Sequence, residues 1–179
     1  DSGYHSQISS VTRPRLGAPA AVATDLVLGY GARVVVRAAT FEIPAGAVTA
    51  LIGPNGSGKS TLLHALAGQL EPRAGRLEVA AWERPGGVAY VLQSTKVNDQ
   101  LPITVRETVT MGRYALTGPF RRLSAADRAA VDEALEAMAI ADLANRQLRE
   151  LSGGQRQRAF VAQGLAQQAD VLLLDEPIT

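Results

Sequence analysis

The stretch over residues 47–70 constrains the fold of this chain more than any other. An apolar run at 47–52 is followed by a glycine-rich segment at 53–60, after which leucines recur at helical spacing up to Leu70. This order predicts a strand, a loop and a helix. The segment also fits the phosphate-binding pattern G-x-x-x-x-G-K-[ST], in the strand-to-helix setting that makes the pattern credible.

The predicted loop has the chemistry to bind a triphosphate. Its glycines can adopt positive φ, so that consecutive backbone N–H groups turn toward an anion, and the following helix adds the positive end of its dipole. Lys59 supplies a charge for the β- and γ-phosphates, and the Ser60 hydroxyl is a suitable ligand for Mg²⁺. The alternative is an ordinary glycine turn that happens to contain a lysine and a serine. The candidate phosphate-binding residues are Gly53, Pro54, Asn55, Gly56, Ser57, Gly58, Lys59, Ser60 and Thr61.

The composition of the chain limits the other functions it can have. Its 179 residues, 46% of them apolar, can bury one sizeable core, which predicts one domain with room for a small inserted lobe. The net charge of +1, with both signs interspersed, gives no support for nucleic-acid binding. The sequence has no cysteine and only two histidines, so we expect no disulfide and no histidine- or cysteine-based metal site. No apolar stretch approaches the ~20 residues of a membrane-spanning helix, so a membrane association would be through a partner.

The N-terminal part of the chain predicts an arm and a hairpin. Residues 1–21 show little apolar periodicity and are expected to form a flexible arm, either a native tail or leftover vector sequence. Short β-rich runs between 22 and 43 flank Gly29, Tyr30 and Gly31, which predicts a hairpin with Tyr30 at its turn. A tyrosine there could stack on a flat ligand ring or be an ordinary strand-end residue, and the residues alone favour neither.

The middle of the chain predicts two strands and then helices. Residues 76–80 and 88–92 are strand-like, and the second run delivers Gln93 to its carboxyl end, where an open α/β sheet binds ligands. A solvated strand-end glutamine is the commoner case. Capping-box patterns at 104–107 and 124–127 each predict the start of a helix. The acidic residues of the second helix are expected on its solvated face and not in a catalytic cluster. They are Asp127, Asp132, Glu133 and Glu136.

The C-terminal part carries two further polar motifs. Ser152 is well placed as the N-cap of a helix, and Gly153 and Gly154 expose backbone N–H groups at its start, which makes a second potential anion site. The apolar run at 171–174 predicts a buried parallel strand that ends in two carboxylates, at 175 and 176. These would be costly to bury without a cation. Mg²⁺ shared with the phosphate loop would offset that cost and leave one carboxylate free to act on a water.

Taken together, these motifs resemble the nucleotide-binding domain of the ATP-binding cassette (ABC) family, in the family's order and spacing. The phosphate loop is its Walker A, Gln93 its glutamine loop, residues 151–155 its signature and residues 171–175 its Walker B, with Glu176 next. The signature Leu-Ser-Gly-Gly-Gln, followed about 20 residues later by Leu-Leu-Asp-Glu-Pro, is nearly diagnostic. The resemblance covers residues 22–179.

The resemblance assigns roles to individual residues. Tyr30 resembles the aromatic that stacks on adenine, and Ser60 and Gln93 resemble Mg²⁺ ligands, with Gln93 also sensing the γ-phosphate. Asp175 is similar to the aspartate that holds Mg²⁺ through water, and Glu176 to the general base that polarises the attacking water. The catalytic residues implied are Glu176, Lys59 and Gln93, and the cofactors implied are ATP and Mg²⁺.

The resemblance also implies a dimer and a fold. In the family, residues that match Ser152, Gly153, Gly154 and Gln155 complete the site of a second subunit, so that two nucleotides lie in a head-to-tail homodimer or pseudo-dimer. The implied fold is an α/β P-loop NTPase three-layer core with an N-terminal antiparallel β subdomain. An inserted α-helical subdomain is expected at about 97–152. The C-terminal part of the sheet is expected to be missing.

A finer resemblance concerns the substrate. Residues 101–114 and 175–179 look like those of the ATPase subunits of bacterial importers of zinc, manganese or iron, although iron-chelate importers have similar helical lobes. This implies a peripheral subunit at the cytoplasmic face of the membrane, bound to a permease and indirectly to a substrate-binding protein. The alternatives are a soluble ABC ATPase of translation or DNA repair, or a nucleotide-binding module without turnover.

The sequence departs from the family's pattern at its end. The chain stops at Thr179, before the family's D-loop and switch histidine, and neither His5 nor His64 can be that histidine because both precede Walker B. We therefore expect this chain to bind ATP weakly and to hydrolyse it poorly unless the missing part is supplied.

Overall fold

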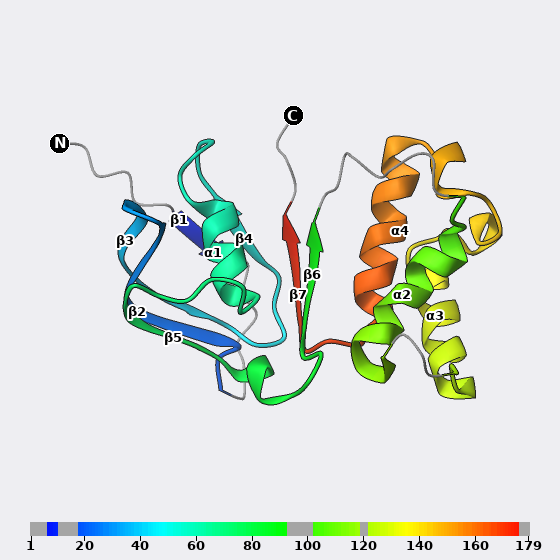
Figure 1. Cartoon of the computed structure of the whole chain (residues 1–179), viewed down its shortest axis with the longest axis horizontal. Coiled ribbons are helices and arrows are strands. Elements are labelled where there is room, and N and C mark those ends of the chain that lie inside the picture. The colour runs from blue at the N-terminus through cyan, green and yellow to red at the C-terminus, as the bar shows by residue number, and fades with distance from the viewer. Residues whose placement is uncertain (1–6, 11–17, 93–101, 119–121, 176–179) are drawn as a thin grey trace. The chain divides into compact units, whose positions relative to one another are not determined.

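The computed structural model of the chain describes residues 7–10, 18–92, 102–118 and 122–175 (Figure 1). The fold divides into two units, residues 1–82 and residues 83–179. The first contains the strands of the predicted N-terminal β subdomain and the phosphate loop, and the second contains the predicted helical lobe and the last strand.

The first unit is built on an antiparallel sheet of three strands. They are β2 (Ala21–Tyr30), β3 (Arg33–Ile43) and β5 (Ala74–Val79), in the order β3-β2-β5. The predicted hairpin is confirmed: Tyr30 ends β2 and pairs with Arg33, so a two-residue turn follows the tyrosine. The bulge residues Asp25 and Ala38 have positive φ and mark irregular register between β2 and β3, a device that increases local twist.

A second, smaller sheet carries the strand that precedes the phosphate loop. This strand, β4 (Thr49–Ile52), pairs antiparallel with β1 (Gln7–Ser10). The expectation that residues 1–21 form an arm without regular structure is therefore wrong at β1. The physical reason is that an open strand edge presents unpaired N–H and C=O groups, which an extended segment can satisfy.

Helix α1 (Lys59–Leu66) follows the phosphate loop and packs against β2 and β3. It buries Leu62, Ala65 and Leu66, whereas Leu26 and Leu28 of β2 are fully buried in the same unit. Burial of each such leucine contributes about 1.5–3 kcal/mol. The helix ends earlier than the leucine spacing predicts, because Gly68 adopts φ +72° and donates to the Ala65 carbonyl, leaving Leu70 outside.

The second unit contains a parallel strand pair. β6 (Val88–Leu92) and β7 (Val171–Asp175) run in the same direction, with Val88 opposite Val171 and Leu92 opposite Asp175. The predicted strands and the parallel pairing are confirmed. The prediction that the last strand is buried is wrong in part, because Leu173 is buried whereas Leu174 is 41% exposed.

Three helices make the rest of the second unit. They are α2 (Val105–Thr117), α3 (Ala125–Ala137) and α4 (Gly153–Ala166). Each begins with a capping box, in which a Thr or Ser side chain and the residue three positions later satisfy each other's backbone N–H groups. The predicted helix starts at Thr104, Ser124 and Ser152 are thus confirmed. Single 3₁₀ turns occur at η1 (Ala80–Glu83), η2 (Ala141–Leu143) and η3 (Leu148–Glu150).

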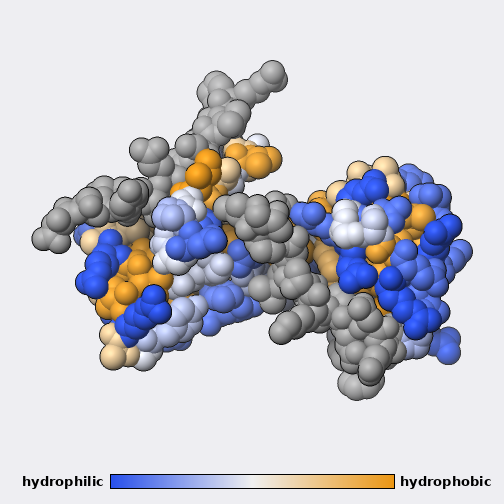
Figure 2. All heavy atoms as spheres, turned by 90° about the horizontal axis from the view of Figure 1, so that it is seen from above, coloured by the Kyte–Doolittle hydropathy of each residue, from blue (hydrophilic) through white to orange (hydrophobic). Residues whose placement is uncertain are grey.

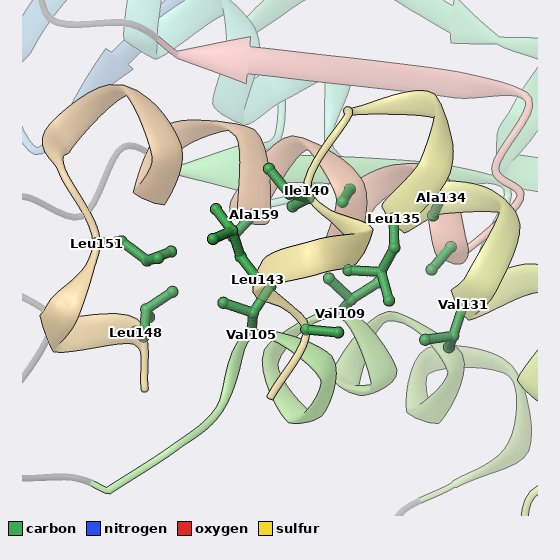
Figure 3. Close-up of a cluster of buried hydrophobic side chains, with 13 residues drawn as sticks. Val105, Val109, Val131, Ala134, Leu135, Ile140, Leu143, Leu148, Leu151 and Ala159 are labelled. Carbon is green, nitrogen blue, oxygen red and sulfur yellow. The ribbon is translucent and has the colours of Figure 1, made fainter. Parts of the chain in front are cut away.

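The helices share one hydrophobic core (Figure 3). Val105 and Val109 of α2 face Val131 and Leu135 of α3, and residues of α4 such as Ala159 close the cluster. Helices α2 and α4 approach closely where Gly112 lies, because a Cβ there would fall 2.1 Å from the Gln163 carbonyl oxygen. Glycine at 112 is therefore a packing requirement.

One of the four acidic residues expected on a solvated face is buried. The Asp127 carboxylate pairs with the Arg113 guanidinium at 2.8 Å, and both side chains are more than nine-tenths buried. The prediction fails here because Asp127 caps the start of its own helix and also pairs with Arg113 of α2, so its charge is satisfied within the protein. The other three, Asp132, Glu133 and Glu136, are exposed as predicted, and Figure 2 shows a mostly hydrophilic surface over the helices.

Candidate functional site

The phosphate loop owes its shape to two glycines. Gly56 and Gly58 have φ of +80° and +96°, in the left-handed region where a Cβ is costly. At Gly58 a Cβ would also come to 3.0 Å from methyl groups of Val35 and Val36. Gly58 is the N-cap of α1 and offers no side-chain cap, and the first turn of this helix carries no acidic residue.

The open start of α1 fits an anion. The first N–H groups of a helix have no acceptor within the helix, and the dipole there favours negative charge. The Ser57 hydroxyl oxygen nearby is buried without a hydrogen-bond partner among the described residues, which is the state expected of a group that awaits a ligand. The segment at 53–61 thus has no side-chain cap on its helix and one buried hydroxyl without a partner among the described residues, features that a bound phosphate could satisfy.

The Lys59 ammonium group folds back over its own loop. Its Nζ donates hydrogen bonds to the carbonyl oxygens of Gly53 at 2.7 Å and Pro54 at 2.9 Å. These carbonyls are neutral acceptors, and a phosphate oxygen is a stronger, charged one. A bound triphosphate can therefore compete with these carbonyls for the ammonium group.

Tyr30 lies in the same unit as the phosphate loop. The residue is 48% exposed at the end of β2, and its hydroxyl shares a hydrogen bond with the imidazole of His64 in α1. The sequence analysis gave His64 no role. No local signal could have found it, because the contact joins residues 34 positions apart.

Asp175 ends β7 at the carboxyl edge of the parallel strand pair. Its Oδ2 accepts a hydrogen bond of 3.2 Å from the hydroxyl of Tyr90, which projects from β6. Tyr90 is a second residue that sequence reasoning missed, since the pairing of β6 with β7 appears only in the structure. Gln93 and Glu176, which follow the two strands, lie outside the described residues.

The predicted signature forms the start of α4. The Ser152 hydroxyl accepts from the Gln155 N–H at 3.3 Å, and the Gln155 side chain accepts from the Ser152 N–H at 2.9 Å. Gly153 and Gly154 are exposed, with open space where a Cβ would lie. The two glycines therefore meet no steric demand within this chain.

The predicted site residues fall into two groups. Tyr30 and residues 53–61 belong to the first unit, whereas Asp175 and residues 152–155 belong to the second. Within the described part of the chain, no three histidine, cysteine, aspartate or glutamate side chains gather to hold a metal ion. None of the helices described is long and apolar enough to cross a membrane.

Comparison with known proteins supports one family. A family model described as "ABC transporter" matches residues 36–179. The manganese transport system ATP-binding protein MntA of Synechocystis is 43% identical over 83% of this chain and 59% of its own length. The zinc transport system ATP-binding protein TroB of Treponema pallidum is 42% identical over 86% of this chain and 59% of its own length. The chain thus spans about three fifths of these relatives.

Solved structures agree with this assignment and with the fold class. CbiO1 from Clostridium perfringens, described as part of the ABC transporter complex CbiONQ, matches with a TM-score of 0.76 and 26% identity. The match covers 90% of this chain and 66% of that one. The predicted α/β P-loop fold, with its antiparallel β subdomain and its helical lobe, is confirmed.

Proposed function

This chain belongs to the ABC transporter family, and from that premise we propose that it binds Mg²⁺-ATP and hydrolyses it to drive transport. The observation that carries the proposal is the open start of α1, where two left-handed glycines, an uncapped helix and a buried hydroxyl leave donors for a phosphate. Residues 53–61 are proposed to hold the phosphates, and Lys59 is proposed to leave the Gly53 and Pro54 carbonyls for the β- and γ-phosphates. Tyr30 is proposed to stack on the adenine.

We also propose residues that would hold the metal and activate the attacking water. Ser60, Gln93 and Asp175 supply the hydroxyl, amide and carboxylate oxygens that suit Mg²⁺, which would neutralise charge on the phosphates. Glu176 would take the proton of the attacking water as general base. The Tyr90 hydroxyl, which donates to Asp175, would orient that carboxylate.

The second anion site is proposed to act across a dimer. The N–H groups at Gly153 and Gly154, with Ser152 and Gln155, would contact the γ-phosphate of a nucleotide held by a second copy or by a similar subunit. Their exposure and the absence of a local steric need for glycine support this role. Hydrolysis would then need both subunits, with positioning and electrostatics supplying most of the catalysis.

The proposed transport process is import of a metal ion. Relatives at about 40% identity are ATP-binding proteins of manganese and zinc transport systems, which supports this substrate class. A permease in the membrane would hold the chain at the cytoplasmic face, and a substrate-binding protein would act indirectly through that permease. The metal would be cargo, bound by those partners.

The test is ATP binding and phosphate release by the intact protein. We expect Glu176→Gln to keep Mg²⁺-ATP binding and to abolish steady-state release of phosphate. Lys59→Ala is expected to lose both, because the charge at the phosphates is gone. Equal turnover in Glu176→Gln and parent would exclude Glu176 as the base, and no ATP binding by the parent would contradict the proposal as a whole.

Transport is tested in cells of the native host. We expect a chromosomal Glu176→Gln substitution to lower uptake of radioactive manganese or zinc, with uptake of an unrelated amino acid as the control. Unchanged uptake of both metals would contradict the metal-import assignment while leaving ATP hydrolysis in place.

A further inference from the structure

A hydrogen bond joins the tyrosine of the hairpin to the helix that follows the phosphate loop. The Tyr30 hydroxyl and the His64 Nδ1 lie 3.0 Å apart, and the phenol donates when that nitrogen is unprotonated. His64 is in the last turn of α1, and Tyr30 is the last residue of β2. The tip of the side chain is thus fixed to the helix while much of the ring stays exposed.

The backbone that carries Tyr30 is also held. The Arg73 guanidinium donates to the Gly31 carbonyl, and the Arg73 N–H donates to the Val27 carbonyl at 2.8 Å. Gly29 packs against the opposite strand so closely that a Cβ would lie 2.1 Å from the Arg33 carbonyl oxygen. With the backbone held, the hydroxyl bond to His64 fixes where the tip of the Tyr30 side chain lies and so limits rotation about its Cα–Cβ bond.

We propose that His64 is a positioning residue for nucleotide binding, which holds the Tyr30 side chain in the rotamer from which its ring stacks on the base. The inference rests on the proposed function, because it assumes that Tyr30 meets the base of a nucleotide whose phosphates lie at the loop. A free tyrosine must lose rotamer freedom when it binds, and a ring that is already fixed avoids that cost. His64 therefore acts through Tyr30 and touches neither the phosphates nor the reacting atoms.

The proposal predicts that His64 affects the binding of the nucleotide's base and not the binding of its phosphates. This difference makes it testable. Loss of one hydrogen bond is expected to weaken ATP binding about 3- to 10-fold. Inorganic tripolyphosphate has no base, so its affinity should not change. A loss of stability in α1 would instead weaken the binding of both ligands, since both bind at the start of the same helix.

The experiment measures the Kd of Mg²⁺-ATP and of Mg²⁺-tripolyphosphate by calorimetry on the intact protein. The variants are His64→Leu, Tyr30→Phe and the double substitution, with Gln69→Leu as a matched control on an exposed residue just beyond α1. His64→Asn is the rescue variant, because an amide can replace the imidazole Nδ1 as a hydrogen-bond partner. Tyr30→Phe keeps the ring and removes only the hydroxyl.

The expected result is the same selective loss of ATP affinity in His64→Leu, Tyr30→Phe and the double variant, with recovery in His64→Asn. Non-additivity of the two substitutions would show that they remove one interaction. The inference is overturned if the parent binds ATP, Lys59→Ala abolishes that binding and His64→Leu still matches the parent. It is also overturned if His64→Leu binds ATP more tightly than the parent does. A loss of tripolyphosphate affinity as large as the loss of ATP affinity overturns it too. A parent that binds neither ligand contradicts the proposed function itself, and this inference with it.

Discussion

The starts of α1 and α4 are both rich in glycine, but only α4 has a side-chain cap. At α4 the Ser152 and Gln155 side chains satisfy each other's backbone N–H groups in a capping box. At α1 the N-cap is Gly58, which has no side chain to offer, and the first turn has no carboxylate. The capping box of α4 satisfies the Ser152 and Gln155 N–H groups and leaves those of Gly153 and Gly154 without a side-chain cap, whereas α1 has no side-chain cap at all. The comparison supports the proposal that the primary phosphate site lies at the start of α1.

The largest effect is expected from the charge at the open helix start. Lys59→Met should weaken Mg²⁺-ATP binding about 100-fold or more, because a charge-assisted contact is lost and the phosphates lose their nearest cation. The unfolding temperature should change little, since the hydrogen bonds that Nζ makes within the described residues go to two carbonyls of its own loop. Calorimetric titration and thermal unfolding of the same samples check both points. An ATP affinity within threefold of the parent would contradict the assignment of the loop.

The two sets of glycines should respond in opposite ways to alanine. Gly58→Ala is expected to lower the unfolding free energy by about 1–3 kcal/mol, because φ of +96° disfavours a Cβ. The added Cβ would also lie 3.0 Å from methyl groups of two valines. Gly154→Ala should be neutral or stabilise by up to about 1 kcal/mol, since the position is helical and open. Urea unfolding of both variants makes the comparison. Equal losses of stability would remove the distinction between the two helix starts.

The cap of α4 can be tested directly. Ser152→Ala should destabilise the protein by about 1 kcal/mol, because the Gln155 N–H loses its acceptor. Ser152→Asp should restore most of this stability, since aspartate also caps helices well. The readout is the midpoint of urea unfolding at constant slope. No loss in Ser152→Ala would mean that the box contributes nothing and that the two helix starts do not differ energetically.

An effect of a different kind is a pH dependence of stability that arises at the start of α3. Hydrogen bonds from the Ser124 side chain and backbone, followed by that from Arg113, lower the Asp127 pKa from 3.8 to about 2. A lowered folded-state pKa means that the contribution is complete above the unfolded pKa and is lost as the pH falls from about 4 through about 2. Unfolding midpoints measured from pH 6 to pH 2 test this.

Two variants control the pH experiment. Asp127→Asn should be less stable than the parent at pH 6 and should approach it at pH 2. Asp132→Asn, on the exposed face of the same helix, should show the same difference in stability between pH 6 and pH 2 as the parent does. A difference in stability between the parent and Asp127→Asn that stays constant from pH 6 to pH 2 would contradict the lowered pKa of Asp127.

Local patterns predicted the local structure well. The glycine-rich loop, the three capped helix starts and the strand at 88–92 all occur where spacing and cap chemistry place them, because these features depend on residues within a few positions. The early end of α1 was missed, although Gly68 is a recognisable helix stop.

The features that sequence reasoning missed depend on contacts between distant residues. Asp127 is buried because Arg113 lies opposite it, and nothing on the polar face of its own helix shows this. The Tyr30–His64 and Tyr90–Asp175 hydrogen bonds join different elements in the same way. The family roles of Gln93 and Glu176 remain predictions, since both residues lie outside the described part of the chain.

The central claim is that the uncapped start of α1 receives the phosphates, whereas the capped helix starts at 104 and 124 do not. Amide chemical shifts of the ¹⁵N-labelled intact protein, recorded as Mg²⁺-tripolyphosphate is added, test this most directly. We predict that the largest shifts occur at residues 56–61, with little change at 104–107 and 124–127. Shifts of equal size at all three helix starts, or none at 56–61, would contradict the account.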